Sequence, residues 1–378
     1  MKSNKLLSIF LCVIFLFTLL LGCSKDEENE HVHGFDTAAS LAAFPPDTVM
    51  LRAGDLEFTW ADLYVFLFRA ASDLSYNFTQ AIEWDEEYIS DMTLAEVVMD
   101  YLSEQISDLL VFDYASNLLG FSLSEEDVEF IQEDIDMLIA DAESVEEFEE
   151  RLFLNGFYNL ETFFSFRLRE LIPWMLITGL YGDDFSDIAD DVVAEYAESN
   201  DFMRAQHILL AFLRTEDGYS LQEIDDNKAD LRAQMEGILE SLIERKEDDN
   251  FFEFFEELMW EYSEDPGRFS SPTGYLFQPN DMVEAFSLAC AALEPGQISN
   301  IVVTSYGYHI LLRLPVDFDK VPISVASAGY DYSLRMLAVM EDFEAKVAAW
   351  REEMTVEFTP EFLSLNLSEI FSWCAHED

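Results

Sequence analysis

The sequence predicts an α+β protein in which a sheet-forming region follows a long helical one. Between about residues 60 and 200, apolar side chains recur three and four positions apart, the period of an amphipathic helix. From Arg204 to Leu210 the pattern changes to the alternation and apolar content of a strand. Helices, a strand, a helix and two strands are expected next, and a last helix follows. Helices and strands segregated along the chain in this way indicate the α+β class.

The helical region has clear local start signals. Two short strands, at 48–52 and 56–59, are expected to form a hairpin around Ala53-Gly54-Asp55. Helix starts are expected where a Ser or Thr precedes an acidic residue by three positions, because the two side chains can cap the first backbone N–H groups. These pairs are Thr59 with Asp62, Thr93 with Glu96, Ser124 with Asp127, and Ser144 with Glu147.

The second half of the chain is expected to contain both helices and strands. Helices are expected at about 221–245, 251–262, 281–293 and 330–353, and strands within 299–314 around a turn at Ser305-Tyr306-Gly307. The aromatic run from Phe251 to Phe255 has two interpretations. Its helical spacing favours a place in the core, and the alternative is a surface that binds client proteins.

The first 23 residues have the order of a secretory signal peptide. Lys2 and Lys5 precede an apolar run at 6–21, and the run ends in Leu20-Leu21-Gly22-Cys23. The alternative is a retained membrane-anchor helix. The last four residues resemble the bacterial lipobox, which implies that Cys23 is lipidated and becomes the mature N-terminus. Acyl chains on Cys23 would anchor the protein to a membrane. The polar segment after it is expected to be a tether.

Composition excludes some classes of partner. The formal net charge is −57, from 77 acidic and 20 basic residues. Such a surface repels nucleic acid and anionic lipid headgroups. We interpret the acidity as a source of solubility, and attraction of basic clients or divalent cations is the alternative. The 33 phenylalanines supply a large core despite the charge.

Two cysteines, Cys290 and Cys374, remain after Cys12 leaves with the signal peptide and Cys23 is lipidated. Two are too few for a disulfide framework. Cys290 lies in an apolar helical stretch and is expected to be buried. A bridge between Cys290 and Cys374 stays open at this point.

Six blocks of sequence between residues 204 and 314 resemble the parvulin family of peptidyl-prolyl isomerases, in the family's order. They are Ala205-Gln206-His207-Ile208-Leu209, Tyr262-Ser263-Glu264-Asp265-Pro266-Gly267, Gly274-Tyr275-Leu276-Phe277, Met282-Val283-Glu284-Ala285-Phe286, Leu293-Glu294-Pro295-Gly296-Gln297-Ile298-Ser299, and Thr304-Ser305-Tyr306-Gly307-Tyr308-His309-Ile310. With the lipobox and the flanking helices, the chain is similar to the PrsA foldase lipoproteins and, more loosely, to the SurA chaperones.

The resemblance implies a small antiparallel sheet flanked by helices, inserted in a mainly helical chaperone domain. The expected boundaries are a signal peptide at 1–22, an acidic tether at 23–45 and a helical chaperone region at 46–200. The isomerase domain is expected at 201–316, and a helical segment at 317–378 is expected to pack back on the chaperone region.

The resemblance also implies the site. His207 and His309 match the family's paired histidines on central strands, Thr304 matches its hydroxyl, and Asp265 falls beside the isomerising bond. Met282 and Phe286 match the proline pocket, with Phe277 and Leu276 as further wall residues. Since Met282 and Phe286 are four apart, we expect them on one face of a helix. Without the family blocks, the same residues would be interpreted as ordinary core and two structural histidines.

The expected function is that of an extracytoplasmic, lipid-anchored foldase that isomerises X-Pro bonds in unfolded or partly folded secreted proteins. The alternative is a non-catalytic holdase with an inactive parvulin fold. A substrate-binding transport lipoprotein would require alternating strand–helix units, which the pattern lacks. The negative charge excludes a nucleic-acid partner, and no cofactor is expected. His31-Val32-His33 in the tether is an alternative metal site, but two histidines in an acidic linker usually have no such role, and no other His, Cys or carboxylate cluster has convincing ligand spacing, so no metal is expected. Homodimerisation stays open.

Overall fold

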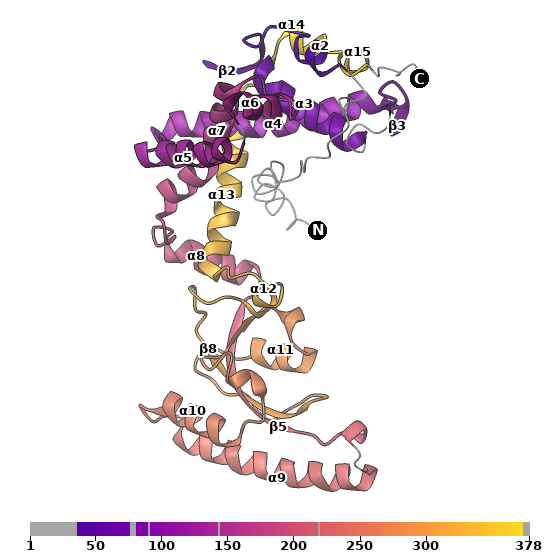
Figure 1. Ribbon diagram of the computed structural model, residues 1–378. Helices are drawn as coiled ribbons and strands as arrows, with labels where there is room; N and C mark the ends of the chain where they lie inside the picture. Colours follow the sequence, from indigo (N-terminus) through magenta and orange to yellow (C-terminus); the bar gives the residue numbers. More distant parts are fainter. Residues whose placement is uncertain (1–35, 76–80, 90, 143, 218–219, 373–378) are drawn as a thin grey trace. The chain divides into compact units, whose positions relative to one another are not determined.

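The computed structural model describes residues 36–75, 81–89, 91–142, 144–217 and 220–372 (Figure 1). These residues divide into two compact units. Unit 1 combines the described residues up to Asp184 with those from Asp342 onward, and unit 2 runs from Phe185 to Glu341. In sequence, unit 2 is therefore an insertion between the two segments of unit 1.

Unit 1 contains a three-stranded antiparallel sheet with the order β2-β1-β9. Its strands are β1 (Val49–Ala53), β2 (Leu56–Thr59) and β9 (Glu357–Phe358). The turn between β1 and β2 places Gly54 at φ +62°, a backbone conformation that glycine adopts without a steric cost. The hairpin predicted around Gly54 is confirmed, and β9 adds a strand from the far end of the chain.

Helices form most of unit 1. They are α2 (Thr37–Leu41), α3 (Trp60–Leu74), α4 (Leu94–Leu119), α5 (Glu125–Asp141), α6 (Val145–Phe153), α7 (Leu160–Tyr181), α14 (Pro360–Leu363) and α15 (Leu367–Ile370), with a small hairpin of β3 (Glu87–Ile89) and β4 (Met92–Thr93). Thr59, Thr93 and Ser124 form reciprocal capping boxes, as predicted. Ser144 also caps its helix, by accepting a hydrogen bond from the backbone of Glu147.

The predicted tether at 23–45 extends too far toward the C-terminus. Residues 37–41 form α2, whose Ser40 and Leu41 are buried. The indole of Trp60 donates to the Leu41 carbonyl at 2.7 Å, and the Tyr64 hydroxyl donates to Ser40 Oγ at 2.9 Å. Buried aromatic residues therefore hold α2 against α3, because their polar atoms need partners away from water. Residues 23–35 lie outside the described part of the chain.

The two chain segments of unit 1 pack on each other. Phe112 of α4 stacks on Phe343, with ring centroids 6.3 Å apart, and Arg351 forms an ion pair with Asp108. Thr359, next to β9, donates its backbone N–H to the Met50 carbonyl at 3.0 Å. Residues more than 200 positions apart thus build one core.

Unit 2 is organised around a four-stranded antiparallel sheet with the order β6-β5-β8-β7. The strands are β5 (Met203–Ala211), β6 (Tyr275–Phe277), β7 (Val302–Val303) and β8 (Gly307–Leu314). The central pair, β5 and β8, aligns eight residues from Arg204 opposite Leu314 to Ala211 opposite Gly307. Gly307 is required at this end, since a Cβ would lie 2.1 Å from the Leu210 carbonyl oxygen.

Helices cover both faces of this sheet (Figure 1). The helices of unit 2 are α8 (Asp190–Ser199), α9 (Leu221–Arg245), α10 (Phe251–Tyr262), α11 (Glu284–Ala291), α12 (Ile323–Ser327) and the first part of α13 (Leu334–Glu353), with short 3₁₀ turns η2 (Thr215–Asp217), η3 (Pro266–Arg268) and η4 (Pro279–Asp281). On one face α9 and α10 pack on Ile208 and Ile310. On the other, α11 packs on Ala205 and Leu311.

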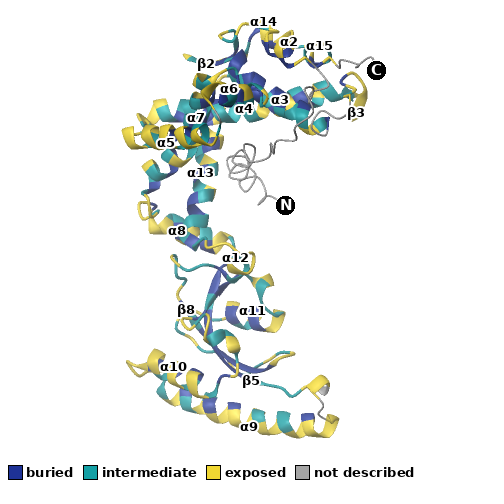
Figure 2. Ribbon diagram, in the orientation of Figure 1, coloured by how far each residue is buried: buried dark blue, intermediate teal, exposed yellow. Residues whose placement is uncertain are grey.

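Burial follows this layering. Figure 2 shows β5 and β8 buried and the outer side of α9 exposed. Phe251 and Phe255 are buried in the core beneath α10, which confirms the core interpretation of that aromatic run. The α+β class with a small antiparallel sheet flanked by helices is thus confirmed.

Two predicted helices begin later than expected. The helix predicted at 330–353 starts at Leu334, and the one predicted at 281–293 is shorter, from Glu284 to Ala291. Pro279 starts η4, in which Asp281 caps the Gln278 backbone at 2.8 Å, so the chain turns before α11 begins. In the described part of the chain, none of the helices combines the length and apolar content that crossing a bilayer requires.

Candidate functional site

Two histidines lie on the central strands of unit 2 and on the same face of the sheet. His207 of β5 is opposite Leu311, and His309 of β8 is opposite Leu209, so the histidines are diagonal neighbours. Their ring centroids are 5.3 Å apart, with the planes inclined by 48°. Both side chains are buried. No hydrogen bond joins the two rings in the described part of the chain, so each ring is held by a different partner.

His207 faces the carboxylate of Asp265. Its Nε2 lies 3.5 Å from Asp265 Oδ2, a long distance for a hydrogen bond. The backbone N–H of Gly267 donates to the other oxygen, Oδ1, at 3.1 Å, and the Tyr275 hydroxyl donates to Oδ2 at 2.7 Å. The carboxylate is thus held by two donors besides the imidazole.

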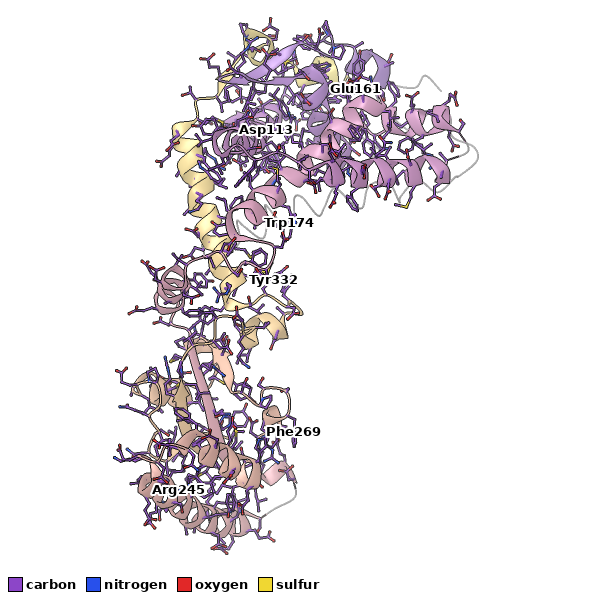
Figure 3. All side chains as sticks on the ribbon, turned by 90° about the vertical axis from the view of Figure 1, so that its left-hand side faces the viewer. Asp113, Glu161, Trp174, Arg245, Phe269 and Tyr332 are labelled. Atoms are coloured by element: carbon purple, nitrogen blue, oxygen red, sulfur yellow. The ribbon has the colours of Figure 1, made fainter. Side chains whose placement is uncertain are left out.

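The loop that carries Asp265 is fixed to β5. Ser263 is buried, and its Oγ accepts the Leu209 N–H at 3.1 Å. Glu264 donates its own N–H to the Leu209 carbonyl at 2.8 Å. These bonds place Asp265 beside His207 although the two are 58 positions apart in sequence. Phe269, labelled in Figure 3, follows η3 on this loop and is exposed.

His309 is held by Thr304. The hydroxyl oxygen of Thr304 lies 2.8 Å from His309 Nε2 and also accepts the Tyr306 N–H at 3.0 Å. The Tyr306 bond fixes the hydroxyl, which can then donate its proton to a neutral Nε2. His309 Nδ1 is buried and has no hydrogen-bond partner within the described ranges.

Burial keeps both imidazoles neutral. Burial, together with the neighbouring His207, lowers the pKa of His309 to about 3, and the negative charge of Asp265 opposes this shift. Burial also lowers the pKa of His207, against the effect of Asp265. At neutral pH the site therefore presents two uncharged rings beside one carboxylate.

Aromatic rings form the apolar side of the site. Phe286 of α11 meets both imidazoles edge-on, at 5.2 Å from His207 and 5.8 Å from His309. It also contacts Phe277 at 5.7 Å. Phe277 and Phe286 are almost completely buried, whereas Met282 packs against them and is partly exposed. Of the three, Met282 thus has the greatest access to a bound peptide.

Two details of the predicted pocket are wrong. Met282 does not share a helical face with Phe286: it has an extended backbone between η4 and α11, and tertiary packing brings the two together. Leu276 is fully buried, but it lies between Tyr275 and Phe277 on β6, and successive strand residues face opposite sides. Leu276 therefore belongs to the face away from the histidines.

Sequence reasoning missed Tyr275. It belongs to a block that resembles the family, but no role was assigned to it. The structure stacks its ring on His207, with centroids 5.9 Å apart and planes inclined by 25°, in addition to its bond to Asp265. Alternation along the short strand could have identified it, because Tyr275 shares a face with the predicted pocket residue Phe277.

Several predicted features lie outside the described residues: the signal peptide at 1–22, the lipid site Cys23 and Cys374. Cys290 is buried and unpaired in the described part of the chain. Within the same residues, no group of three or more His, Cys, Asp and Glu side chains could hold a metal ion.

Part of this chain matches a known protein family. Residues 207–314 match the family model "Rotamase: PPIC-type PPIASE domain". "Foldase protein PrsA" from Geobacillus sp. (strain WCH70) is 45% identical over 62 residues, which are 16% of this chain and 22% of that relative. The matched segment thus spans about a fifth of the curated relative's length.

Solved structures of similar proteins include two of PrsA. PrsA from Bacillus subtilis is 16% identical to this chain, and the match covers 82% of this chain and 92% of the Bacillus subtilis chain, with a TM-score of 0.23. PrsA from Bacillus cereus is 14% identical, and the match covers 87% of this chain and 100% of the Bacillus cereus chain, with a TM-score of 0.32. The resemblance rests on the family model: residues 207–314 match a parvulin, or PPIC-type, peptidyl-prolyl isomerase domain.

Proposed function

We propose that unit 2 catalyses cis–trans isomerisation of X-Pro bonds in protein clients. The observation that carries this proposal is the pair of buried, neutral imidazoles with Asp265 on one side and Phe286 across both rings. No covalent bond to the substrate is needed. Rotation must only overcome amide resonance, a barrier of roughly 18 to 20 kcal/mol.

The arrangement favours the twisted amide over the planar one. A planar amide is charge-separated and a twisted amide is less polar, so an apolar surface formed by Met282 and Phe286 stabilises the twist. The charge of Asp265 acts in the same direction when it lies near the substrate carbonyl, because it disfavours negative charge on that oxygen. Lowering the barrier by about 4 kcal/mol accelerates rotation roughly a thousandfold.

Kinetics with a proline-containing peptide tests this proposal. We expect the purified chain to accelerate isomerisation, and His309→Ala and Asp265→Ala each to reduce kcat/KM at least tenfold with the fold intact by circular dichroism. Ser305→Ala, an exposed neighbour of Thr304, is the control. Full activity in both site variants would remove these residues from the mechanism, and an inactive wild-type chain would leave only a non-catalytic role.

A second proposed activity is the holding of unfolded clients by unit 1. Phe130 and Met137 lie two turns apart on one side of α5 and are 58% and 63% exposed, so both apolar side chains are accessible to a client segment. A hollow of about 430 Å³ lies among α5, α6 and α7. Its lining combines apolar and polar side chains: Gln132, Ile135, Glu149, Asn159, Leu160, Glu161 and Phe164. Glu161 is labelled in Figure 3.

Aggregation of a proline-free client separates this activity from isomerisation. We expect the chain to suppress aggregation, and a double variant, Phe130→Ser with Met137→Ser, to suppress it several-fold less. Leu221→Ser, which removes an exposed apolar side chain from unit 2, is the matched control. Equal suppression by wild type and double variant would contradict a client surface on α5.

An extracytoplasmic location and a lipid anchor at Cys23 complete the proposal. They are supported by the basic, apolar and Leu20-Leu21-Gly22-Cys23 order of the first residues. Labelling with palmitate tests the anchor: we expect incorporation into the wild-type chain and none into Cys23→Ser.

A further inference from the structure

Tyr275 contacts Asp265 and His207, which lie together on one side of the proposed isomerase site. Its hydroxyl donates to Asp265 Oδ2 at 2.7 Å, and its ring stacks on His207. The strand register fixes this position, because β6 pairs Tyr275 with Ala205, two residues before His207 on β5. A side chain on the same face can therefore reach the imidazole.

The Tyr275 hydroxyl and the Gly267 N–H hold the two oxygens of Asp265 separately. The Asp265 side chain is 17% exposed, so water has limited access to it. Hydrogen bonds donated to a carboxylate stabilise its charged form. They also fix its orientation, which an isolated contact of 3.5 Å with His207 would not do.

We propose that Tyr275 is a positioning residue, whose hydroxyl holds the Asp265 carboxylate directed at His207. The role deepens the proposed isomerase function and rests on it for its catalytic consequence. Tyr275 acts through Asp265 and is not assigned a contact with the substrate.

The charged and titratable groups that face Asp265 come from three strands. They are His207 of β5, His309 of β8 and Tyr275 of β6. Burial lowers the pKa of both histidines, so neither supplies a positive charge at neutral pH. Burial and the bond to Asp265 raise the pKa of the Tyr275 phenol, which therefore keeps its proton and remains a donor. The stabilising donors to the anion are thus Tyr275 and the Gly267 amide.

Tyr275→Phe tests the proposal because it keeps the stacked ring and removes only the donor. We expect the pKa of Asp265, measured by carboxyl NMR titration, to rise by about one unit, since a hydrogen bond to a charged group is lost. The fall of kcat/KM at acidic pH should therefore begin about one pH unit higher in Tyr275→Phe than in the wild type. At pH values below the start of this fall, kcat/KM of the variant should be about tenfold lower than that of the wild type. This fall at acidic pH is the acid limb of the profile. Asp265→Asn should have no such limb.

Tyr262→Phe makes the same chemical change on the opposite side of the sheet, where the Tyr262 ring packs against the core beneath α10. It should leave the pKa of Asp265 and the pH profile unchanged. An unchanged pKa of Asp265 in folded Tyr275→Phe would overturn the proposal. Should that variant fail to fold, Asp265→Asn gives the reciprocal measurement: loss of the charge must lower the pKa of Tyr275, and an unchanged value would overturn the proposal equally.

The two NMR titrations do not depend on turnover. If the wild-type chain proves inactive, the proposed isomerase function fails, and the titrations still decide whether Tyr275 holds the Asp265 anion. If the chain is active and the titrations show no coupling, the positioning role fails and the isomerase function stands.

Discussion

His207 and His309 are close but are held from opposite sides, His207 by Asp265 and His309 by Thr304. Their ring centroids are 5.3 Å apart, and Phe286 lies edge-on to both. Each ring therefore depends on its own polar partner, and the two partners come from loops at residues 263–267 and 304–307. A substitution can therefore change the surroundings of one histidine without changing those of the other.

Loss of the Thr304 hydroxyl should disturb His309 and the Tyr306 N–H, which both bond to it, and should leave His207 in place. In Thr304→Val the His309 Nε2 loses its partner at 2.8 Å, and an unpaired buried polar group costs about 1 to 3 kcal/mol. We expect kcat/KM for a proline peptide to fall about tenfold, which corresponds to about 1.4 kcal/mol. Thr304→Ser keeps a hydroxyl and should restore most of the activity. Equal activity of the Val and Ser variants would show that the hydroxyl has no role in turnover.

Acid should destabilise unit 2 through His309. The unfolded side chain titrates near pH 6.5 and the folded one at about 3, so the unfolded state binds more protons between these values and stability falls as the pH falls. The loss should approach about 1.4 kcal/mol per pH unit within this window. Denaturant unfolding at pH 7 and pH 4.5 measures it. Between pH 7 and pH 4.5 the free energy of unfolding of His309→Gln should fall by about 2 kcal/mol less than that of the wild type. Equal decreases in the two proteins would contradict the conclusion that His309 is buried in its neutral form.

Met282→Ala and Leu276→Ala should have different effects, because Met282 lies on the histidine side of the sheet and Leu276 lies on the opposite side. Met282 lies on the histidine side and is partly exposed, so its truncation should raise KM several-fold and change stability little. Leu276 is fully buried on the other face, and its truncation should cost about 2 to 5 kcal/mol of stability with KM unchanged. Steady-state kinetics and urea unfolding measure the two effects. A higher KM in Leu276→Ala than in Met282→Ala would reverse the assignment.

Arg169 should stabilise unit 1. Its guanidinium pairs with Asp62 at 3.3 Å and with Asp113, labelled in Figure 3, at 3.2 Å, and lies over the Phe58 ring. Burial raises the pKa of Asp113, and Arg169 opposes that effect. Arg169→Ala leaves two carboxylates without their cation and should lower the free energy of unfolding by about 3 kcal/mol.

Arg52→Ala is the control for Arg169, because the side chains of Arg52 and its partner Glu57 are about half exposed, at 46% and 51%. Exposed ion pairs contribute little, so the control should change stability by less than about 1 kcal/mol. Similar urea midpoints for the two variants would show that the Arg169 ion pairs contribute no more than a surface pair does.

Much of the local structure could be predicted from the sequence because its causes are local. The helix starts at Thr59, Thr93 and Ser124 depend on side chains three residues away, and the Gly54 turn depends on one residue. The spacing of Met282 and Phe286 is also a local signal, but it gave a wrong prediction because the two residues do not lie in one helix. Four-residue spacing indicates one helical face only within a helix, and η4 with its own cap ends before α11 starts.

The sequence by itself determined the α+β class and most element boundaries, and it predicted that His207, Asp265, Thr304 and His309 belong to one site. The tertiary structure decided which atoms meet. The register of β5 with β8 makes the histidines diagonal neighbours, and the pairing of β6 with β5 brings Tyr275 to Asp265 and turns Leu276 away. Strand register depends on burial across the whole sheet, and a shift of one residue would exchange the two faces. That choice involves contacts far apart in the chain, so no local pattern of residues contains it.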